Sequence, residues 1–287
     1  MRPTNLHTRI FLDSGGVDDT KIALDAIGFL DGQTTNPTYF VKSNKIQEQL
    51  KAGKKFTNEE LLASYRETIE SINKLIPKGS ISIEIYADKL TTAYGMIKQA
   101  TEMNEWILNA HIKFPIIPEG MRAAHMALEK GIRVNITLCF TQEQAAAVYA
   151  MSRGVKKGDI FVSLFMGRHF DAGKRGIDLI QNIIEMYKPG DGHVEALAAS
   201  LRSLDQFLAA IQSGTDIITA GLKYINLWAE NGMNLPGDDF FYNPEGEEAI
   251  EYQEFDLSKP WDSFNIQHEM TSNGLDQFAR DWSALIK

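Results

Sequence analysis

Short runs of apolar, often β-branched residues alternate along this chain with longer segments whose apolar residues recur every three to four positions. The first pattern is typical of buried strands, and the second is typical of helices that cover a sheet. The pattern predicts strands at residues 9–13, 29–34, 81–85, 110–115, 132–138, 159–165, 194–199 and 215–220. It predicts helices at 17–27, 44–51, 58–76, 89–106, 119–130, 141–153, 173–187, 203–213 and 221–231.

Eight strands with interleaved helices fit either a closed (β/α)8 barrel or an open, doubly wound sheet. The strand count favours the barrel, and no G-x-G-x-x-G follows a strand to indicate a dinucleotide site. The fold class we expect is therefore α/β, with a single (β/α)8 TIM barrel over residues 1–234.

Two further segments follow the predicted barrel. Residues 235–262 carry nine acidic residues and one lysine, a local net charge of −8. We expect residues 235–265 to form an exposed acidic excursion; a mobile lid or a subunit contact is the alternative. Residues 266–287 contain a predicted amphipathic helix near 273–286, which should pack on the barrel or on a neighbouring subunit. We expect a homo-oligomer.

Composition narrows the function. The chain has 44% apolar and 23% charged residues, as expected of a globular domain with a real core, and no apolar run long enough to cross a bilayer. Its N-terminal residues lack the apolar stretch of a signal peptide, and it has one cysteine, so we expect a cytoplasmic protein. With a net charge of −9 and no basic run, it should bind neither nucleic acid nor an anionic membrane.

Polar residues stand at or just past the ends of the predicted strands, where barrel enzymes carry their active sites. One buried polar residue in a strand is usually a structural group with its hydrogen bonds satisfied. Here such residues come from six different strands and should converge at one end of the barrel. They are Asp13, Asn36, Glu84, Lys113, Asn135, Thr137, Ser163 and Arg168.

Lys113 is the sharpest of these candidates because apolar residues flank it on both sides. Burial disfavours the charged form of a lysine, and a neutral amine can attack a ketone to form an iminium that assists cleavage of the adjacent C–C bond. The alternative is a structural ion pair with Glu84 or Asp13, or a lysine that extends to the rim of the barrel. The residues alone leave both interpretations open, and either carboxylate could also transfer protons for such chemistry.

Two arginines predict an anion site at the late strands. Arg168 follows the sixth strand and Arg202 the seventh, with Ser163 and Ser200 beside them. The guanidinium group suits phosphate, and barrel phosphate sites commonly lie at these strands. The six histidines show no metal-ligand spacing, so no metal is expected.

Seven motifs, in order along the barrel, resemble the transaldolase family of class I aldolases. They read FLDS at 11–14, DGQTTNPT at 31–38, ISIE at 81–84, IKFP at 112–115, GIRVNITL at 131–138, VSLFMGR at 162–168 and ASLR at 199–202.

The resemblance implies a sugar-phosphate substrate and a Schiff base at Lys113 that carries a dihydroxyacetone unit, with no cofactor. It implies that Glu84 and Thr137 position a proton-relaying water and that Asp13 is the acid–base group for C–C cleavage. The implied substrate-binding residues are Asn36, Asn135, Ser163, Phe165, Arg168, Ser200 and Arg202, with the arginines on the phosphate.

The resemblance also leaves two branches of the family open. Pro115 and Glu119-Gly120 are similar to the pattern of the smaller fructose 6-phosphate aldolases, and so is the run from Phe278 to Trp282. That branch carries Gln where this chain has Glu84, which favours ketol transfer between sugar phosphates over simple aldol cleavage. A non-catalytic barrel that binds sugar phosphates is a third interpretation.

Overall fold

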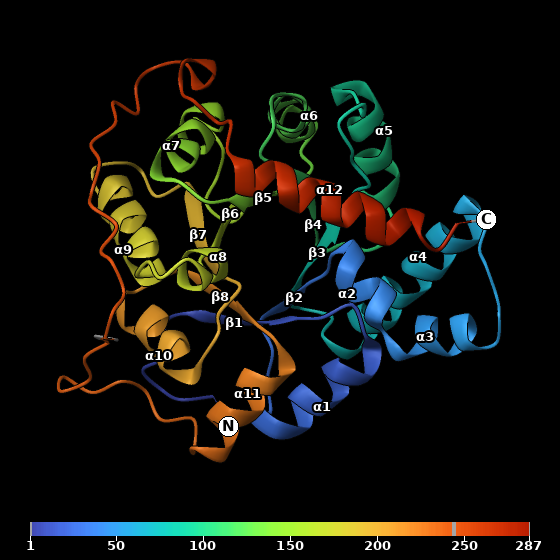
Figure 1. Cartoon of the computed structure of the whole chain (residues 1–287), viewed down its shortest axis with the longest axis horizontal. Helices are drawn as coiled ribbons and strands as arrows, with labels where there is room; N and C mark the ends of the chain where they lie inside the picture. Colours follow the sequence, from blue (N-terminus) through green and yellow to red (C-terminus); the bar gives the residue numbers. More distant parts are fainter. Residues whose placement is uncertain (1, 243–244, 287) are drawn as a thin grey trace.

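The protein, described here by a computed structural model over residues 2–242 and 245–286, is built around a closed barrel of eight parallel strands. Each strand pairs with its neighbours in chain order, and β8 pairs with β1 (Figure 1). The predicted TIM barrel is therefore confirmed. The strands are β1 Arg9–Asp13, β2 Gly32–Thr34, β3 Ser80–Glu84, β4 Ala110–Pro115, β5 Val134–Cys139, β6 Ile160–Phe165, β7 Val194–Ala199 and β8 Ile217–Ala220.

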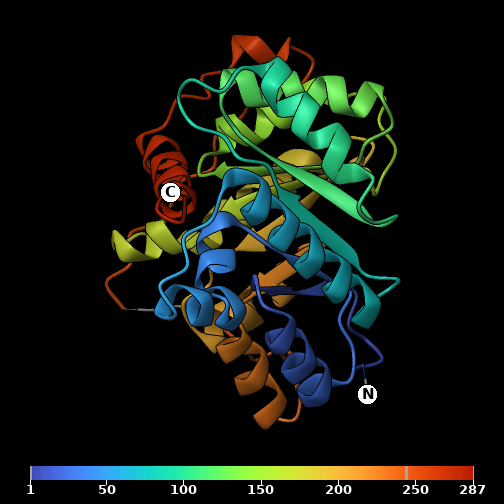
Figure 2. The ribbon, with the colours of Figure 1, turned by 90° about the vertical axis from the view of Figure 1, so that its right-hand side faces the viewer.

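Helices surround the barrel on its outside (Figures 1 and 2). Side-chain caps begin several of them: Thr57 and Glu60 form a capping box at α4, and Thr141 and Gln144 form another at α7. The helices are α1 Val17–Ile27, α2 Pro37–Lys42, α3 Asn44–Lys51, α4 Asn58–Leu75, α5 Ala93–Asn104, α6 Pro118–Glu129, α7 Gln142–Met151, α8 Gly167–Asp171, α9 Gly176–Tyr187, α10 Leu204–Gln212, α11 Leu222–Glu230 and α12 Glu269–Ser283. Neither α2 nor α8 was predicted. None of the helices within the described residues is both long and apolar enough to span a membrane.

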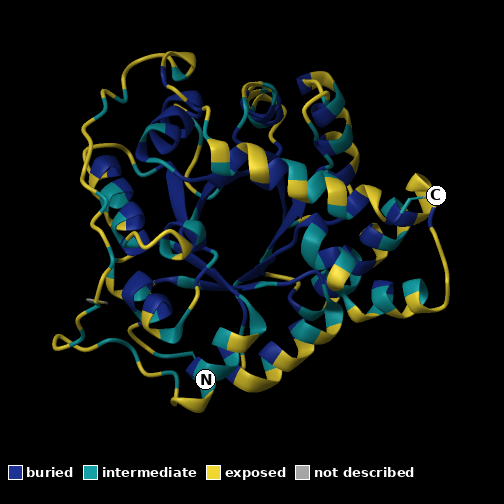
Figure 3. Ribbon diagram, viewed as in Figure 1, coloured by how far each residue is buried: buried dark blue, intermediate teal, exposed yellow. Residues whose placement is uncertain are grey.

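Two apolar cores hold the barrel. The larger lies between the strands and the surrounding helices, and Figure 3 shows it as a buried ring. The smaller fills the barrel interior with Phe11, Phe161, Leu197, Ala199 and Ile217. The middle of the interior is therefore largely apolar, although Asn135 lies in register with Phe161.

The end where the strands begin is closed by a structural polar layer. Arg9 lies 2.7 Å from Glu195, and the His111 ring stacks on Phe161 at 4.0 Å. His111 also hydrogen-bonds to Ser80, 2.7 Å away, and burial lowers the pKa of His111 to about 3. A neutral, packed histidine of this kind supports the barrel.

The C-terminal helix α12 lies across the other end of the barrel, over the ends of β3, β4 and β5 (Figure 1). Near its start, the Thr271 hydroxyl donates to the Leu138 carbonyl at 3.0 Å. Near its end, Trp282 packs on Phe40 and Tyr65, with ring centroids 5.9 Å from each. The helix therefore packs on its own barrel. It begins at Glu269, four residues before the predicted range 273–286.

The acidic segment 235–262 runs along the outside of α10, α9 and α7 before it reaches α12 (Figure 1). Side chains of those helices bind its backbone: Gln212 donates to Phe240 O at 2.8 Å, and Asn182 donates to Ile250 O at 2.8 Å. The Gln142 amide donates to Glu251 O at 2.8 Å. Much of the segment is exposed (Figure 3), but its described residues are hydrogen-bonded to these helices and lie away from the barrel mouth.

Candidate active site

The strand register gathers the buried polar residues into one layer. Glu84 pairs with Lys113 across β3 and β4, and Lys113 pairs with Asn135 across β4 and β5. Successive side chains on a strand alternate between its faces, so partners in register share a face. The three residues therefore lie side by side inside the barrel, just above the apolar layer.

Lys113 is buried, and its side chain is 3% exposed. Its Nζ lies 2.7 Å from Glu84 Oε2 and donates to the Thr35 carbonyl oxygen at 3.0 Å. Thr35 in turn donates its hydroxyl to Ser82 O at 2.8 Å, which fixes the carbonyl that holds the lysine. The amine thus has a defined position in a buried environment.

Two carboxyl groups flank the lysine, the buried Glu84 and the half-buried Asp13, and both have raised pKa values. At Glu84 burial raises the pKa, Lys113 opposes the shift, and the charge of Asp13 adds to it. At Asp13 burial also raises the pKa, and Lys113 and the hydroxyl of Thr34, a donor at 2.7 Å, oppose it. Carboxyl groups whose pKa is moved toward neutrality are suited to proton transfer.

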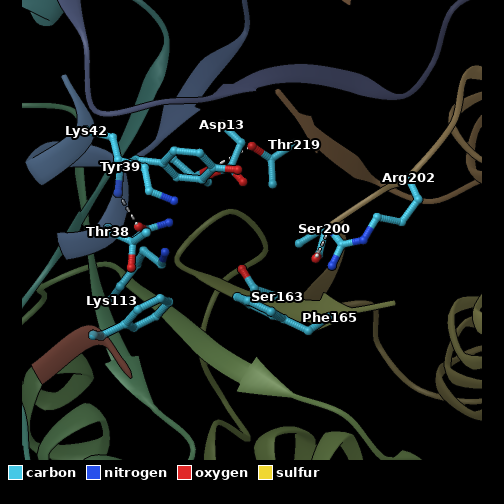
Figure 4. Close-up of a pocket in the computed structure, with 14 residues that line it drawn as sticks. Asp13, Thr38, Tyr39, Lys42, Lys113, Ser163, Phe165, Ser200, Arg202 and Thr219 are labelled. Carbon is cyan, nitrogen blue, oxygen red and sulfur yellow. Dashed lines mark hydrogen bonds between the residues drawn. The ribbon is translucent and has the colours of Figure 1, made fainter. Parts of the chain in front are cut away.

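A cavity of about 310 Å³ opens above this layer (Figure 4). Seven of the predicted site residues line it: Asp13, Asn36, Lys113, Ser163, Phe165, Ser200 and Arg202. Among the other predicted residues, Asn135 lies below Ser163 and accepts a hydrogen bond from the Ser163 hydroxyl at 2.7 Å. Thr137 is buried on β5, and its Oγ1 has no hydrogen-bond partner among the described residues.

Arg202 and Ser200 form the cationic wall of this cavity. Arg202 Nη1 donates to Ser200 Oγ at 3.2 Å, and Arg202 Nη2 donates to Asp171 at 3.0 Å. Gly167 makes this arrangement possible, because a Cβ there would lie 2.4 Å from Ser200 O and 2.7 Å from Arg202 Cζ. Ser200 itself has a φ of 65°, which a non-glycine residue rarely adopts outside functional or strained sites.

Arg168 departs from the expected arrangement and does not line the cavity. Its Nη1 donates to the Met270 carbonyl at 2.5 Å, and its guanidinium lies over the Phe140 ring, 5.4 Å from the centroid. Met270 is in α12, and Phe140 stacks on His268 just before that helix, so Arg168 binds the start of the C-terminal helix. Sequence spacing could not reveal this, because the partner carbonyl is 102 residues away.

The cavity also contains residues that sequence reasoning missed. Thr38, Tyr39 and Lys42 come from α2, Thr34 and Thr219 from β2 and β8, and Phe278 from α12. Asn36 caps α2, accepting from Tyr39 N at 2.9 Å, and Pro37 is its first residue. This Asn-Pro pair is a helix-start signal that could have predicted α2. No cluster of three or more His, Cys, Asp or Glu able to hold a metal occurs within the described ranges.

Comparison with known proteins adds the family. Residues 10–287 match the family model described as Transaldolase/Fructose-6-phosphate aldolase. The chain belongs to this family.

Two relatives are named probable transaldolases. A probable transaldolase of Dehalococcoides mccartyi is 29% identical over 279 residues, which covers 97% of this chain and 100% of the relative. A probable transaldolase of Leptospira biflexa is 37% identical over 210 residues, covering 73% of this chain and 85% of the relative. Among solved structures, 3-hexulose-6-phosphate synthase from Salmonella typhimurium matches 78% of this chain at 12% identity and a TM-score of 0.48, covering 99% of that protein. The family and the relatives indicate a transaldolase-type aldolase. The cavity above Lys113 is its candidate active site because the polar residues described above converge there.

The buried pair predicts a pH-dependent stability in a lysine variant. Lys113→Met should cost about 3–5 kcal/mol at pH 8, because it leaves the Glu84 carboxylate unpaired and buried. Since burial raises the pKa of Glu84, the folded variant takes up a proton that the unfolded chain does not bind, and its free energy of unfolding should rise as the pH falls from 8 to 5. Urea unfolding at a series of pH values measures this.

The control is the double variant Lys113→Met/Glu84→Gln, which has no carboxyl group at position 84. Its stability should follow pH less steeply than that of Lys113→Met. Equal slopes would mean that Glu84 does not titrate in the folded protein.

Proposed function

We propose that this chain is a transaldolase that moves a three-carbon dihydroxyacetone unit between sugar phosphates through a Schiff base at Lys113. The donors are sedoheptulose 7-phosphate or fructose 6-phosphate, and the acceptors are erythrose 4-phosphate or glyceraldehyde 3-phosphate. The observation that carries the proposal is the buried Lys113 amine, fixed at the base of a cavity between two carboxyl groups with raised pKa values. The family supports the same chemistry.

The reaction needs proton transfers that these residues can make. The Lys113 amine attacks the ketose carbonyl, and loss of water leaves an iminium. We expect Glu84, 2.7 Å from the amine, to hold the water that relays protons in this step together with Thr137, whose buried hydroxyl has no hydrogen-bond partner among the described residues. Asp13 then accepts the proton of the substrate hydroxyl as the C–C bond breaks.

Substrate binding uses the upper part of the cavity. Ser163 and Asn36 line it with hydrogen-bonding groups suited to sugar hydroxyls, and Phe165 supplies an apolar face. Arg202 at the rim is placed to bind the phosphate, although it is now engaged with Asp171. Phosphate would compete with that carboxylate for the guanidinium donors.

A second candidate is a fructose 6-phosphate aldolase, which releases free dihydroxyacetone. The family description covers both reactions, and Pro115 and Glu119-Gly120 are similar to that branch. Glu84 in place of the glutamine of that branch favours transfer.

Borohydride trapping tests the Schiff base. Reduction in the presence of fructose 6-phosphate should add the mass of the reduced ketose or of its three-carbon fragment to the peptide that contains Lys113. Lys113→Ala should lose both the adduct and turnover while it stays folded. Lys42→Met removes another lysine of the same cavity and should keep the adduct on Lys113. A wild-type protein that no ketose phosphate labels would contradict the proposal.

The dependence on an acceptor separates the two reactions. We expect fructose 6-phosphate consumption to be slow without an aldose phosphate and to rise steeply when erythrose 4-phosphate is added, because the enamine needs an electrophile to leave the lysine. Release of free dihydroxyacetone is the second quantity to measure. Equal turnover with and without acceptor would identify the aldolase.

The phosphate site predicts a difference between two arginines. Arg202→Ala should raise KM for phosphorylated donors by roughly 10–100-fold, the range for a lost hydrogen-bonded charge pair. Arg168→Ala, the control, should leave KM nearly unchanged and lower stability instead, because Arg168 binds the Met270 carbonyl. Steady-state kinetics and thermal unfolding of both variants measure this. An equal rise in KM would place both arginines on the phosphate.

A further inference from the structure

Tyr39 lies in the cavity wall beside the carboxyl group assigned to proton transfer. It belongs to the first turn of α2, and its ring lines the same cavity as Asp13 and Lys113. In Figure 4 the Tyr39 hydroxyl points toward the Asp13 carboxylate, and its hydrogen-bonding contribution lowers the pKa of that carboxyl. None of the motif-based assignments includes this tyrosine.

Asp13 depends on such donors because burial opposes its charge. Thr34 Oγ1 donates to Asp13 Oδ1 at 2.7 Å and lies 2.6 Å from the Thr219 hydroxyl as well. Tyr39 approaches the carboxylate from the cavity side. Hydrogen bonds to the charged form of an acid favour that form, so each donor lowers the pKa that burial raises.

The position of Tyr39 is set by contacts on both sides of it in the chain. The Asn36 side chain accepts from Tyr39 N at 2.9 Å and fixes the start of the helix. Thr38 hydrogen-bonds to Asp281, and Phe40 packs on Trp282, so α12 holds the turn against the barrel. The hydroxyl is therefore presented to Asp13 by a rigid turn.

Tyr39 also lies within electrostatic reach of Arg202, each affecting the pKa of the other. A substrate attached to Lys113 with its phosphate at Arg202 would thus pass the Tyr39 hydroxyl. The bond to be cleaved lies between those two ends, next to Asp13.

We propose that Tyr39 is a positioning residue that holds the Asp13 carboxylate in place, aimed at the substrate hydroxyl. The inference rests on the proposed function. In the cleavage step the proton of the C4 hydroxyl moves to Asp13, C4–O becomes the carbonyl of the departing aldose, and the electron pair of the C3–C4 bond enters the enamine on Lys113. Tyr39 keeps its own proton and acts through Asp13.

Tyr39→Phe tests this with little change in shape. Loss of one hydrogen bond to a charged group should raise the pKa of Asp13, and the acidic limb of the kcat/KM profile should move to higher pH by about one unit. Cleavage should slow by about tenfold. Borohydride trapping of the Lys113 adduct should be unchanged, since the Lys113 contacts do not include Tyr39.

Tyr187→Phe is the matched control. It removes a buried tyrosine hydroxyl that donates to Ala145 O at 2.7 Å, between α9 and α7 and outside the cavity. It should lower stability without moving the pH profile. The carboxyl ¹³C signal of Asp13, titrated in wild type and Tyr39→Phe, gives a readout independent of turnover.

The outcomes separate the two proposals. A trapped adduct in wild type with a pH profile and an Asp13 titration that Tyr39→Phe leaves unmoved would overturn the role of Tyr39 alone. Absence of any adduct in wild type would overturn the proposed function, and the inference with it.

Discussion

The chemistry of this site depends on burying one ion pair at the edge of an apolar barrel core. Lys113 and Glu84 lose their hydration, and they hold each other at 2.7 Å above the phenylalanines and aliphatic residues of the interior. Removing charge from water costs several kcal/mol per ion, so such a pair persists only where geometry and further hydrogen bonds offset that cost. Here the Thr35 carbonyl and the register of β3 and β4 supply both.

The same dry environment shapes the groups around the pair. Asp13 and Glu84 face one lysine, so one cation opposes two carboxyl groups, and burial raises the pKa of each. At Asp13 the neighbouring hydroxyl groups of Thr34 and Tyr39 oppose the rise in pKa that burial causes. The hydroxyl groups of the cavity wall therefore help to set the pKa of Asp13.

Much of the barrel could be predicted from the sequence, because each strand is a short apolar run and polar residues recur at the strand ends. The candidate site was only partly predictable. Arg168 and Arg202 look equivalent in sequence, but their directions depend on Met270 and Ser200, which are brought near by folding. Tyr39 was missed because α2 is a single short helix whose start, at Asn36-Pro37, lies inside a motif assigned to the substrate.

The contacts between α2 and α12 have a consequence for how the chain folds. Thr38 and Asp281 are 243 positions apart, so the cavity wall that contains Tyr39 is completed by one of the most distant contacts in the chain. Contacts of long sequence separation form late, after the loop-closure entropy has been met by other interactions. The barrel strands can therefore associate before the cavity has its final shape, and the cavity wall is complete only when the segments near the two ends of the polypeptide have met.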